Sequence, residues 1–154
     1  MSVELITVKR GLVLFWSVWF SLVSASNVAD GLKALGLARK GWRFASGNLR
    51  LLESVTARYQ VPRSLNGALF AGVVLWELIV TGLFWRASWH YCRGSRDRRP
   101  LDAAFAAGLG LWGPLLIADE LFVAYESGTE AAHVRYFVAQ LATLLSIELL
   151  PDRR

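Results

Sequence analysis

The segment 101–125, LDAAFAAGLGLWGPLLIADELFVAY, constrains the fold more than any other part of this sequence. It is apolar almost throughout and long enough to cross a hydrocarbon core of about 30 Å as a helix. Its first half is rich in small residues, which let helix backbones approach closely inside a bilayer. Pro114 frees a backbone carbonyl near Gly110, and the far end carries Asp119 and Glu120, which hydrocarbon tolerates only when they face protein or water. We interpret the segment as a membrane-spanning packing helix.

The composition agrees with a membrane location. The 154 residues are 55% hydrophobic, with a mean hydropathy of +0.39, which is more apolar than an ordinary soluble domain. The net charge of +5 arises from basic residues between apolar segments, which is typical of membrane proteins and gives no reason to expect a nucleic-acid partner. The single cysteine, Cys92, excludes an internal disulfide. We expect a single integral membrane domain over 1–154, in contact with the lipid bilayer.

Three further segments have spanning length: roughly 10–30, 65–91 and 131–150. The first also fits a secretory signal, because a basic start and an apolar stretch precede small residues at 23–26. We interpret it as the first span. The sequence therefore predicts an all-α membrane protein with four transmembrane helices in an antiparallel bundle.

The first loop is long, and one part of it has a helical pattern. The piece 46–59, SGNLRLLESVTARY, places apolar residues at helical spacing with charges opposite. These apolar residues are Leu49, Leu52, Val55 and Tyr59. We expect a short helix on the membrane surface, capped by Ser46 or Asn48, with a solvated loop as the alternative.

The loop after the second span, CRGSRDRRP, sets the predicted topology. It is short and contains Arg93, Arg96, Arg98 and Arg99. Such a basic run belongs on the cytoplasmic side of a membrane. With four crossings, both termini join it there, in a bacterial inner membrane, and the first loop lies outside despite its own basic residues.

Glu77 falls near the bilayer centre, where a carboxylate costs about 2.5–3.5 kcal/mol on insertion scales. Ser17, Ser21, Gln140 and the carbonyl freed by Pro114 have matching depth. We therefore expect Glu77 to be neutral and to donate to one of them. A structural hydrogen bond and a proton-relay or ligand role both remain open.

A second polar group gathers toward the predicted outer surface. It comprises Asn27, Asp30, Asp119, Glu120, Glu126, Glu130, His133 and Arg135. Glu130 and His133 are three apart, as in carboxylate-bridged metal bundles, so Glu120, Glu130 and His133 are weak candidates for a metal site. Ser127 and Glu130 equally form a capping box, and an ion-paired helix end involving Arg135 is the simpler interpretation.

The aromatic and histidine residues call for no cofactor. His90 and His133 lie at opposite ends of predicted spans, so they cannot ligate one haem iron. Four tryptophans inside spans fit lipid or core packing, or contact with a pigment, a quinone or partner helices: Trp16, Trp19, Trp76 and Trp112. No catalytic motif is present, and we expect no bound cofactor.

The polar positions resemble those of an uncharacterised bacterial family of predicted small integral membrane proteins with four spans. The matched positions are Asn27-Val-Ala-Asp30, Asn48, Glu77, Glu120-Leu-Phe122 and Ala132 to Arg135-Tyr-Phe137. The resemblance implies the topology and the polar positions, not an activity. This chain departs from the family at Asp119, where a small residue is usual, and in its more basic first loop.

From these features we expect a non-catalytic accessory subunit of a larger membrane complex of the electron-transfer type, with other membrane subunits as partners. A small ion- or proton-coupled transporter using Glu77 is one alternative, and a metal-binding membrane protein is another. The residues expected to be buried and structural are Asn27, Asp30, Asn48, Glu77, Glu120 and Gln140.

Overall fold

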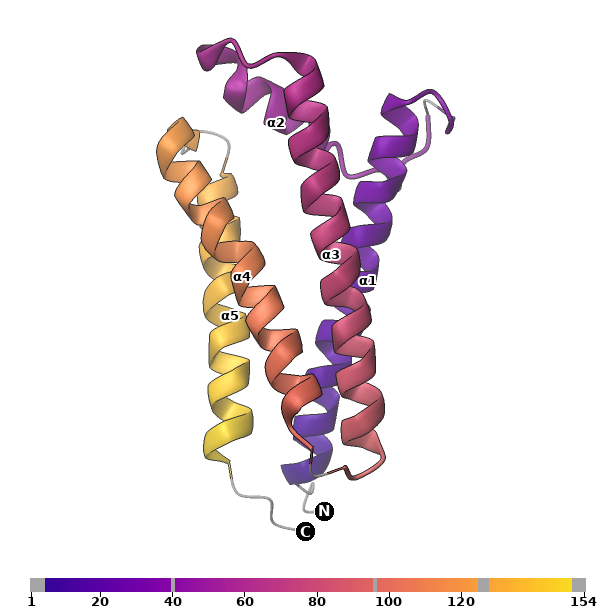
Figure 1. Ribbon diagram of the computed structural model, residues 1–154, viewed down its shortest axis with the longest axis vertical. Helices are drawn as coiled ribbons and strands as arrows, with labels where there is room; N and C mark the ends of the chain where they lie inside the picture. The colour runs from indigo at the N-terminus through magenta and orange to yellow at the C-terminus, as the bar shows by residue number, and fades with distance from the viewer. Residues whose placement is uncertain (1–4, 40, 96, 125–127, 151–154) are drawn as a thin grey trace.

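All of the regular secondary structure in the described part of the chain is helical. The structure is a computed structural model, and it describes residues 5–39, 41–95, 97–124 and 128–150. Its elements are α1 (Leu5–Ala34), α2 (Asn48–Thr56), the short 3₁₀ helix η1 (Ala57–Tyr59), α3 (Arg63–Cys92), α4 (Arg99–Phe122) and α5 (Thr129–Leu149) (Figure 1). The described residues contain no β-strand.

Three of these helices, α1, α3 and α4, are long and apolar enough to cross a membrane. They correspond to the predicted spans 10–30, 65–91 and 101–125, although α1 begins five residues earlier than predicted. The helix α5 corresponds to the predicted span 131–150 but does not reach the same combination of length and apolarity. Glu130, His133 and Arg135 occupy its first two turns, which lowers the hydropathy of that half.

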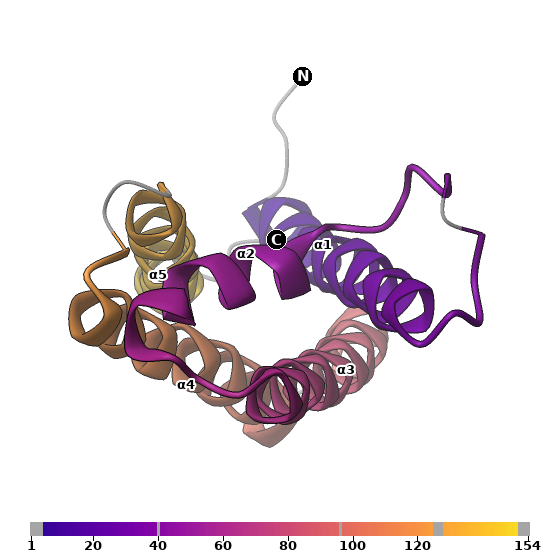
Figure 2. The ribbon, with the colours of Figure 1, turned by 90° about the horizontal axis from the view of Figure 1, so that it is seen from above.

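The four long helices lie side by side along the longest axis of the molecule (Figure 1). In chain order α1 packs on α3, α3 on α4 and α4 on α5, whereas α1 and α5 touch only slightly. Figure 2 shows α2 lying across one end of this arrangement. We call this end the α2 end, and the opposite end, where residues 93–98 join α3 to α4, the basic-loop end.

Glycines in the left-handed region end two of the long helices. At Gly36 φ is 75°, and the Leu37 amide donates to the Leu32 carbonyl at 2.9 Å. At Gly94 φ is 74°, and the Ser95 amide donates to the His90 carbonyl at 3.1 Å. Both are Schellman-type ends, in which glycine avoids the steric penalty that a Cβ would bring. After the turn at Gly36 the chain continues into the first loop, and after the turn at Gly94 it continues into the basic loop.

The helix predicted within 46–59 is confirmed as α2 and η1, which together cover residues 48–59. Its far end is attached to α4, because the Tyr59 hydroxyl donates to the Leu121 carbonyl at 3.1 Å. The Tyr59 ring also meets Phe122 edge-on, with centroids 5.3 Å apart. The segment therefore reaches from α1 to α4 across the α2 end (Figure 2).

The core is aromatic. Phe20 stacks on Phe84 with centroids 5.4 Å apart, and Phe84 meets Phe105 edge-on at 5.2 Å. Trp16 and Trp112 are buried in the same cluster. Among the tryptophans expected inside spans, Trp19 packs against this cluster and Trp76 is exposed. Most of these aromatic rings therefore pack against one another inside the chain.

Candidate functional site

Glu77 pairs with Asn27 across the interface between α1 and α3. Both residues are buried, and the Asn27 Nδ2 donates to Oε1 and Oε2 of Glu77, each at 2.8 Å. The carboxyl group therefore accepts hydrogen bonds in this contact rather than donating one. The predicted partners Ser17, Ser21, Gln140 and the carbonyl near Gly110 were wrong. The two helices are offset along their axes, so that Ser17 lies opposite Ser88 and Asn27 is the residue that faces Glu77.

Two further contacts connect this pair to α2. The Asn48 Nδ2 donates to the Asn27 Oδ1 at 2.9 Å, so the Asn27 amide is bonded on both sides. One turn further along α1, Asp30 Oδ2 accepts the Leu49 amide at 2.9 Å and the Ser46 hydroxyl at 3.4 Å. A carboxylate at a helix N-terminus satisfies free amides and favours the helix dipole. We call Asn27, Asp30, Ser46, Asn48 and Glu77 the polar network.

The polar network joins α1, α2 and α3 at one point. Its members differ in how far they are exposed. Asn27, Asp30 and Glu77 are buried, whereas Asn48 is an exposed residue whose amide still reaches inward. Ser46 adds a further contact, because its Oγ accepts the Asn48 amide at 3.2 Å. The predicted capping residues were Ser46 and Asn48. The N-cap residue of α2 is Gly47, so neither prediction was right, although the Ser46 hydroxyl accepts the first amide of the helix and the side chain of Asn48 is turned to Asn27.

A row of hydroxyl groups continues from Glu77 along the same interface. The Ser24 and Thr81 hydroxyls are 3.3 Å apart, and those of Ser17 and Ser88 are 2.7 Å apart. Between them, Ser21 accepts the indole N–H of Trp85 at 2.9 Å. We call the residues Ser17, Ser21, Ser24, Thr81 and Ser88 the hydroxyl ladder. Hydrogen bonds of this kind join helices inside a bilayer, each contributing about 0.6 kcal/mol on average.

A second site joins α4 to α5 at the α2 end. His133 Nδ1 lies 2.6 Å from Asp119 Oδ2, and the Thr129 hydroxyl donates to Asp119 Oδ1 at 3.1 Å. The ring of Trp112 lies 6.0 Å from that of His133. Asp119 is buried and Glu120 is exposed, so the expected burial of Glu120 was wrong. Adjacent helical residues point about 100° apart, and only Asp119 faces α5.

The metal candidates are not brought together. No three His, Cys, Asp or Glu side chains are grouped closely enough to hold a metal ion within the described ranges. His133 is hydrogen-bonded to Asp119, and the Arg135 Nε donates to the Ala131 carbonyl. Within the described residues, the expected ion pair of Arg135 at this helix end is therefore replaced by a contact between His133 and Asp119. Ser127 of the predicted capping box lies outside the described residues, and the N-cap of α5 is Gly128.

Gln140 is fully buried, but it is not the hydrogen-bond partner of Glu77 that was expected. Its amide packs directly on Gly108 of α4, where a Cβ would overlap it. Neither polar atom of the amide has a hydrogen-bond partner in the part of the chain that the structure describes, and the same holds for Trp112 Nε1. The small residues of α4 thus admit a large polar side chain from α5, which agrees with a packing role for segment 101–125.

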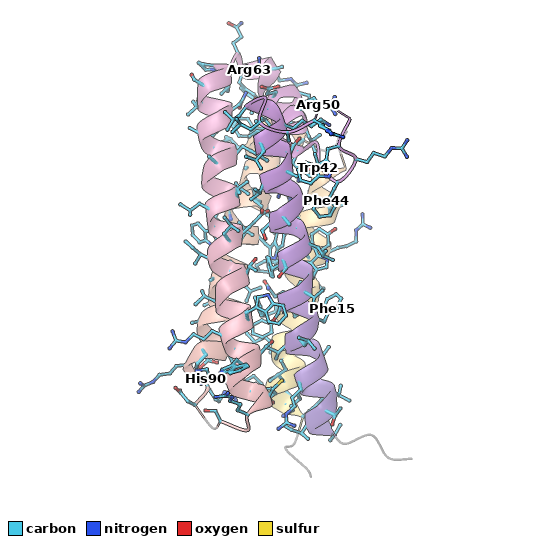
Figure 3. All side chains as sticks on the ribbon, turned by 90° about the vertical axis from the view of Figure 1, so that its right-hand side faces the viewer. Phe15, Trp42, Phe44, Arg50, Arg63 and His90 are labelled. Atoms are coloured by element: carbon cyan, nitrogen blue, oxygen red, sulfur yellow. The ribbon has the colours of Figure 1, made fainter. Side chains whose placement is uncertain are left out.

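The two histidines are at opposite ends of the molecule. Figure 3 shows His90 at the basic-loop end, away from Arg50 and Arg63 at the α2 end. His133, in the first turns of α5, belongs to the α2 end. His90 lines a cavity of about 950 Å³ between the ends of α1, α3, α4 and α5.

Sequence reasoning missed the Asp119–His133 pair and the hydroxyl ladder. The ladder had a signal: Ser17, Ser21 and Ser24 follow one another at spacings of four and three, which places them on one face of a helix. The Asp119–His133 pair had a partial signal, because both residues belong to the polar group predicted toward the outer surface. Which residues of that group pair with one another depends on the register of two different helices.

The positions that carried the family resemblance in the first half of the chain, Asn27, Asp30, Asn48 and Glu77, all meet in the polar network. Comparison with protein-family models, with characterised proteins and with solved structures found no match to this chain.

Proposed function

We propose that this chain is a non-catalytic accessory subunit of a larger complex in a bacterial inner membrane, of the electron-transfer type. In this proposal α5 is the fourth span: its 21 residues reach about 31 Å as a helix, and it runs antiparallel to α4. Ile6, Gly94 and Leu150 line the same cavity, so the two helical ends of the chain and the basic loop share one side. The positive-inside rule assigns that side to the cytoplasm.

The observation that carries the proposal is the outward face of α3. Exposed residues recur along it at spacings of four and three, which is the spacing of a helix–helix seam. They are Ala68, Gly72, Leu75, Ile79, Gly82, Arg86 and Trp89. At Gly72 and Gly82 an added Cβ would meet nothing within 4 Å, so a partner backbone has room to approach. We call this face the α3 seam.

The polar network supports the same proposal, because it fixes the direction in which the seam points. Glu77 lies on the face of α3 opposite the seam and is bonded to Asn27 of α1. A carboxyl group held in this way resists rotation of α3 about its axis, since rotation would leave it unpaired in an apolar environment. Glu77 then acts as a positioning residue for a docking helix.

The test is purification of a tagged full chain from its native membranes in a mild detergent, read by native mass spectrometry. We expect a stoichiometric membrane partner with the wild-type chain. Gly72→Leu should reduce its recovery at least fivefold, because the added side chain blocks the seam, while its Cβ would meet no atom of this chain within 4 Å. Gly11→Leu is the matched control, since Gly11 is exposed on α1 and equally open. Recovery of the chain alone or as a homo-oligomer would contradict the proposal.

A second candidate is proton-coupled transport, which the hydroxyl ladder favours. The ladder leads from Glu77 along the α1–α3 interface toward the cavity at the basic-loop end. Proton uptake into liposomes holding the purified chain tests it, with Glu77→Gln as the variant and Glu53→Gln of α2 as the control. If transport is the function, only Glu77→Gln abolishes uptake. If the chain is an accessory subunit, all three proteins match empty liposomes.

A further inference from the structure

The first loop turns back along the length of α1. The Ser46 amide donates to the Ser26 carbonyl at 3.1 Å, although α1 continues for eight residues beyond Ser26. At 1.5 Å per helical residue, the chain has returned by about 12 Å at this point. Figure 3 agrees, because Trp42 and Phe44 lie nearer the basic-loop end than Arg50 does. The loop therefore comes back to lie beside the last two turns of α1.

Large apolar side chains are exposed on this part of the loop. We call its described residues, 35–39 and 41–45, the return segment. Leu35 and Leu37 are 74% and 73% exposed, and the rings of Trp42 and Phe44, 6.4 Å apart, are nearly half exposed. A group of this kind marks contact with a membrane or with another protein. Because the segment lies where a spanning helix ends, it is at the level of the lipid headgroups, where tryptophan is enriched.

The return segment also has positive charge that this chain does not neutralise. Arg39 and Arg43 are exposed, and neither forms an ion pair within the described residues. Between α1 and α3 the sequence contains five basic residues and one acidic residue, Glu53, which is bonded to Arg63 of α3. The carboxylate that precedes the loop, that of Asp30, is buried and bonded to the Leu49 amide of α2. The segment therefore combines exposed cations with exposed apolar side chains.

We propose that the return segment lies in the headgroup layer of the membrane and binds the phosphate of an anionic phospholipid. Arg39 and Arg43 line a hollow of about 690 Å³ together with apolar residues that include Leu32, Leu37 and Trp42. Phosphate oxygens accept charge-assisted hydrogen bonds from guanidinium groups, and the apolar wall suits the glycerol and acyl part of the lipid. A lipid without net charge would place its own cation beside two arginines. This role also explains basic residues in a loop that the positive-inside rule does not require.

The first experiment measures the depth of the segment. The full chain with Cys92→Ser and Phe44→Cys carries a nitroxide spin label at residue 44, in vesicles of phosphatidylcholine and phosphatidylglycerol. Oxygen concentrates in lipid and a nickel chelate in water, so the ratio of their collision rates with the label reports depth. Ser54→Cys, at an exposed position of α2, is the matched control. We expect the oxygen-to-nickel ratio at residue 44 to be at least about fivefold that at residue 54. Equal ratios would place the segment in water and overturn the proposal.

The second experiment measures which lipid binds. The chain labelled at residue 44 is titrated in a neutral detergent with short-chain phosphatidylglycerol or short-chain phosphatidylcholine, and the line shape of the label is recorded. Phe44 is not part of the lining of the hollow but its ring lies beside that of Trp42, so the label reports binding at this place alone. We expect phosphatidylglycerol to bind at least about tenfold more tightly, because two arginines face its phosphate. Equal affinities overturn the phosphate assignment.

Two double variants of the labelled chain separate a local contact from total charge. Arg39→Gln with Arg43→Gln should weaken binding of phosphatidylglycerol at least about tenfold, since each arginine near an anionic lipid contributes about fivefold. Arg50→Gln with Arg58→Gln removes the same charge from exposed positions of α2 and η1, outside the lining of the hollow. It should weaken binding less than about twofold, because salt screens charges at that separation. Equal losses in the two double variants would contradict the proposal.

Discussion

Replacing Asn27 by leucine removes the amide that holds Glu77. The side chains are similar in size, so the change deletes hydrogen bonds more than it deletes volume. The amide's contact with the two carboxyl oxygens, each at 2.8 Å, corresponds to about 1.5–3 kcal/mol if the acceptor is charged. The bond from Asn48 at 2.9 Å adds about 0.6 kcal/mol, the average measured between membrane helices. We expect Asn27→Leu to lower the free energy of unfolding by about 2–4 kcal/mol.

The second variant shows whether the loss comes from the orphaned carboxyl group. With Glu77→Leu added, no buried carboxyl group is left unpaired, and burying two apolar side chains costs little. The Asn48 amide still loses its acceptor on Asn27, but Asn48 is an exposed residue. The double variant should therefore be more stable than Asn27→Leu alone, and the coupling free energy should exceed about 1.5 kcal/mol. Reversible unfolding in mixed detergent micelles, followed by tryptophan fluorescence, measures all four proteins. Leu78→Ala, on the exposed side of α3, controls for general effects and should stay within about 0.5 kcal/mol of wild type.

A coupling free energy below about 0.5 kcal/mol would refute this reasoning, because residues that act independently are additive within that margin. The contact between Asn27 and Glu77 would then not stabilise the packing of α1 on α3. Glu77 could no longer be described as the residue that fixes the rotation of α3 about its axis. The accessory-subunit proposal would lose its second support, although the seam experiment would still test it.

Two further predictions concern α4. Gly108→Ala places a methyl group against the buried amide of α5 and should destabilise the chain by about 1–3 kcal/mol, whereas Gly82→Ala, in open space, should not lower the thermal midpoint in detergent. Asp119→Ala leaves His133 without its partner at 2.6 Å and should cost about 1–2 kcal/mol in the same assay, while Ile117→Ala, at an exposed position of the same helix, should change stability by less than about 0.5 kcal/mol. Equal effects within either pair would contradict the packing described.

The sequence was sufficient to predict the long helices, because apolar runs of spanning length have few alternatives in a membrane. It was also sufficient for the helix over residues 48–59, whose apolar face is visible in the pattern of Leu49, Leu52 and Val55. Helix ends were less accurate. The first helix continues back to Leu5, because a helix does not stop where hydropathy falls but where its backbone groups find other partners.

Contacts between helices could not be predicted from the sequence. Depth counting placed Ser17 and Ser21 beside Glu77, but the true partner, Asn27, lies about two to three turns further along α1. An offset between two helices along their axes changes every partner across the interface. The choice between Asp119 and Glu120 failed for a similar reason, since adjacent residues face different directions and only the packing of α5 decides which is buried. Side-chain pairing needs the rotation of each helix as well as its position along the axis.

The distribution of polar contacts explains how four apolar helices find one arrangement. Apolar side chains pack as well against lipid as against each other, so they specify pairing only weakly. Asn27–Glu77 and the hydroxyl ladder join α1 to α3, while Asp119–His133 joins α4 to α5. The α1–α3 pair of helices contacts the α4–α5 pair through aromatic packing and through the Trp76 indole, which donates to the Ala107 carbonyl at 3.0 Å.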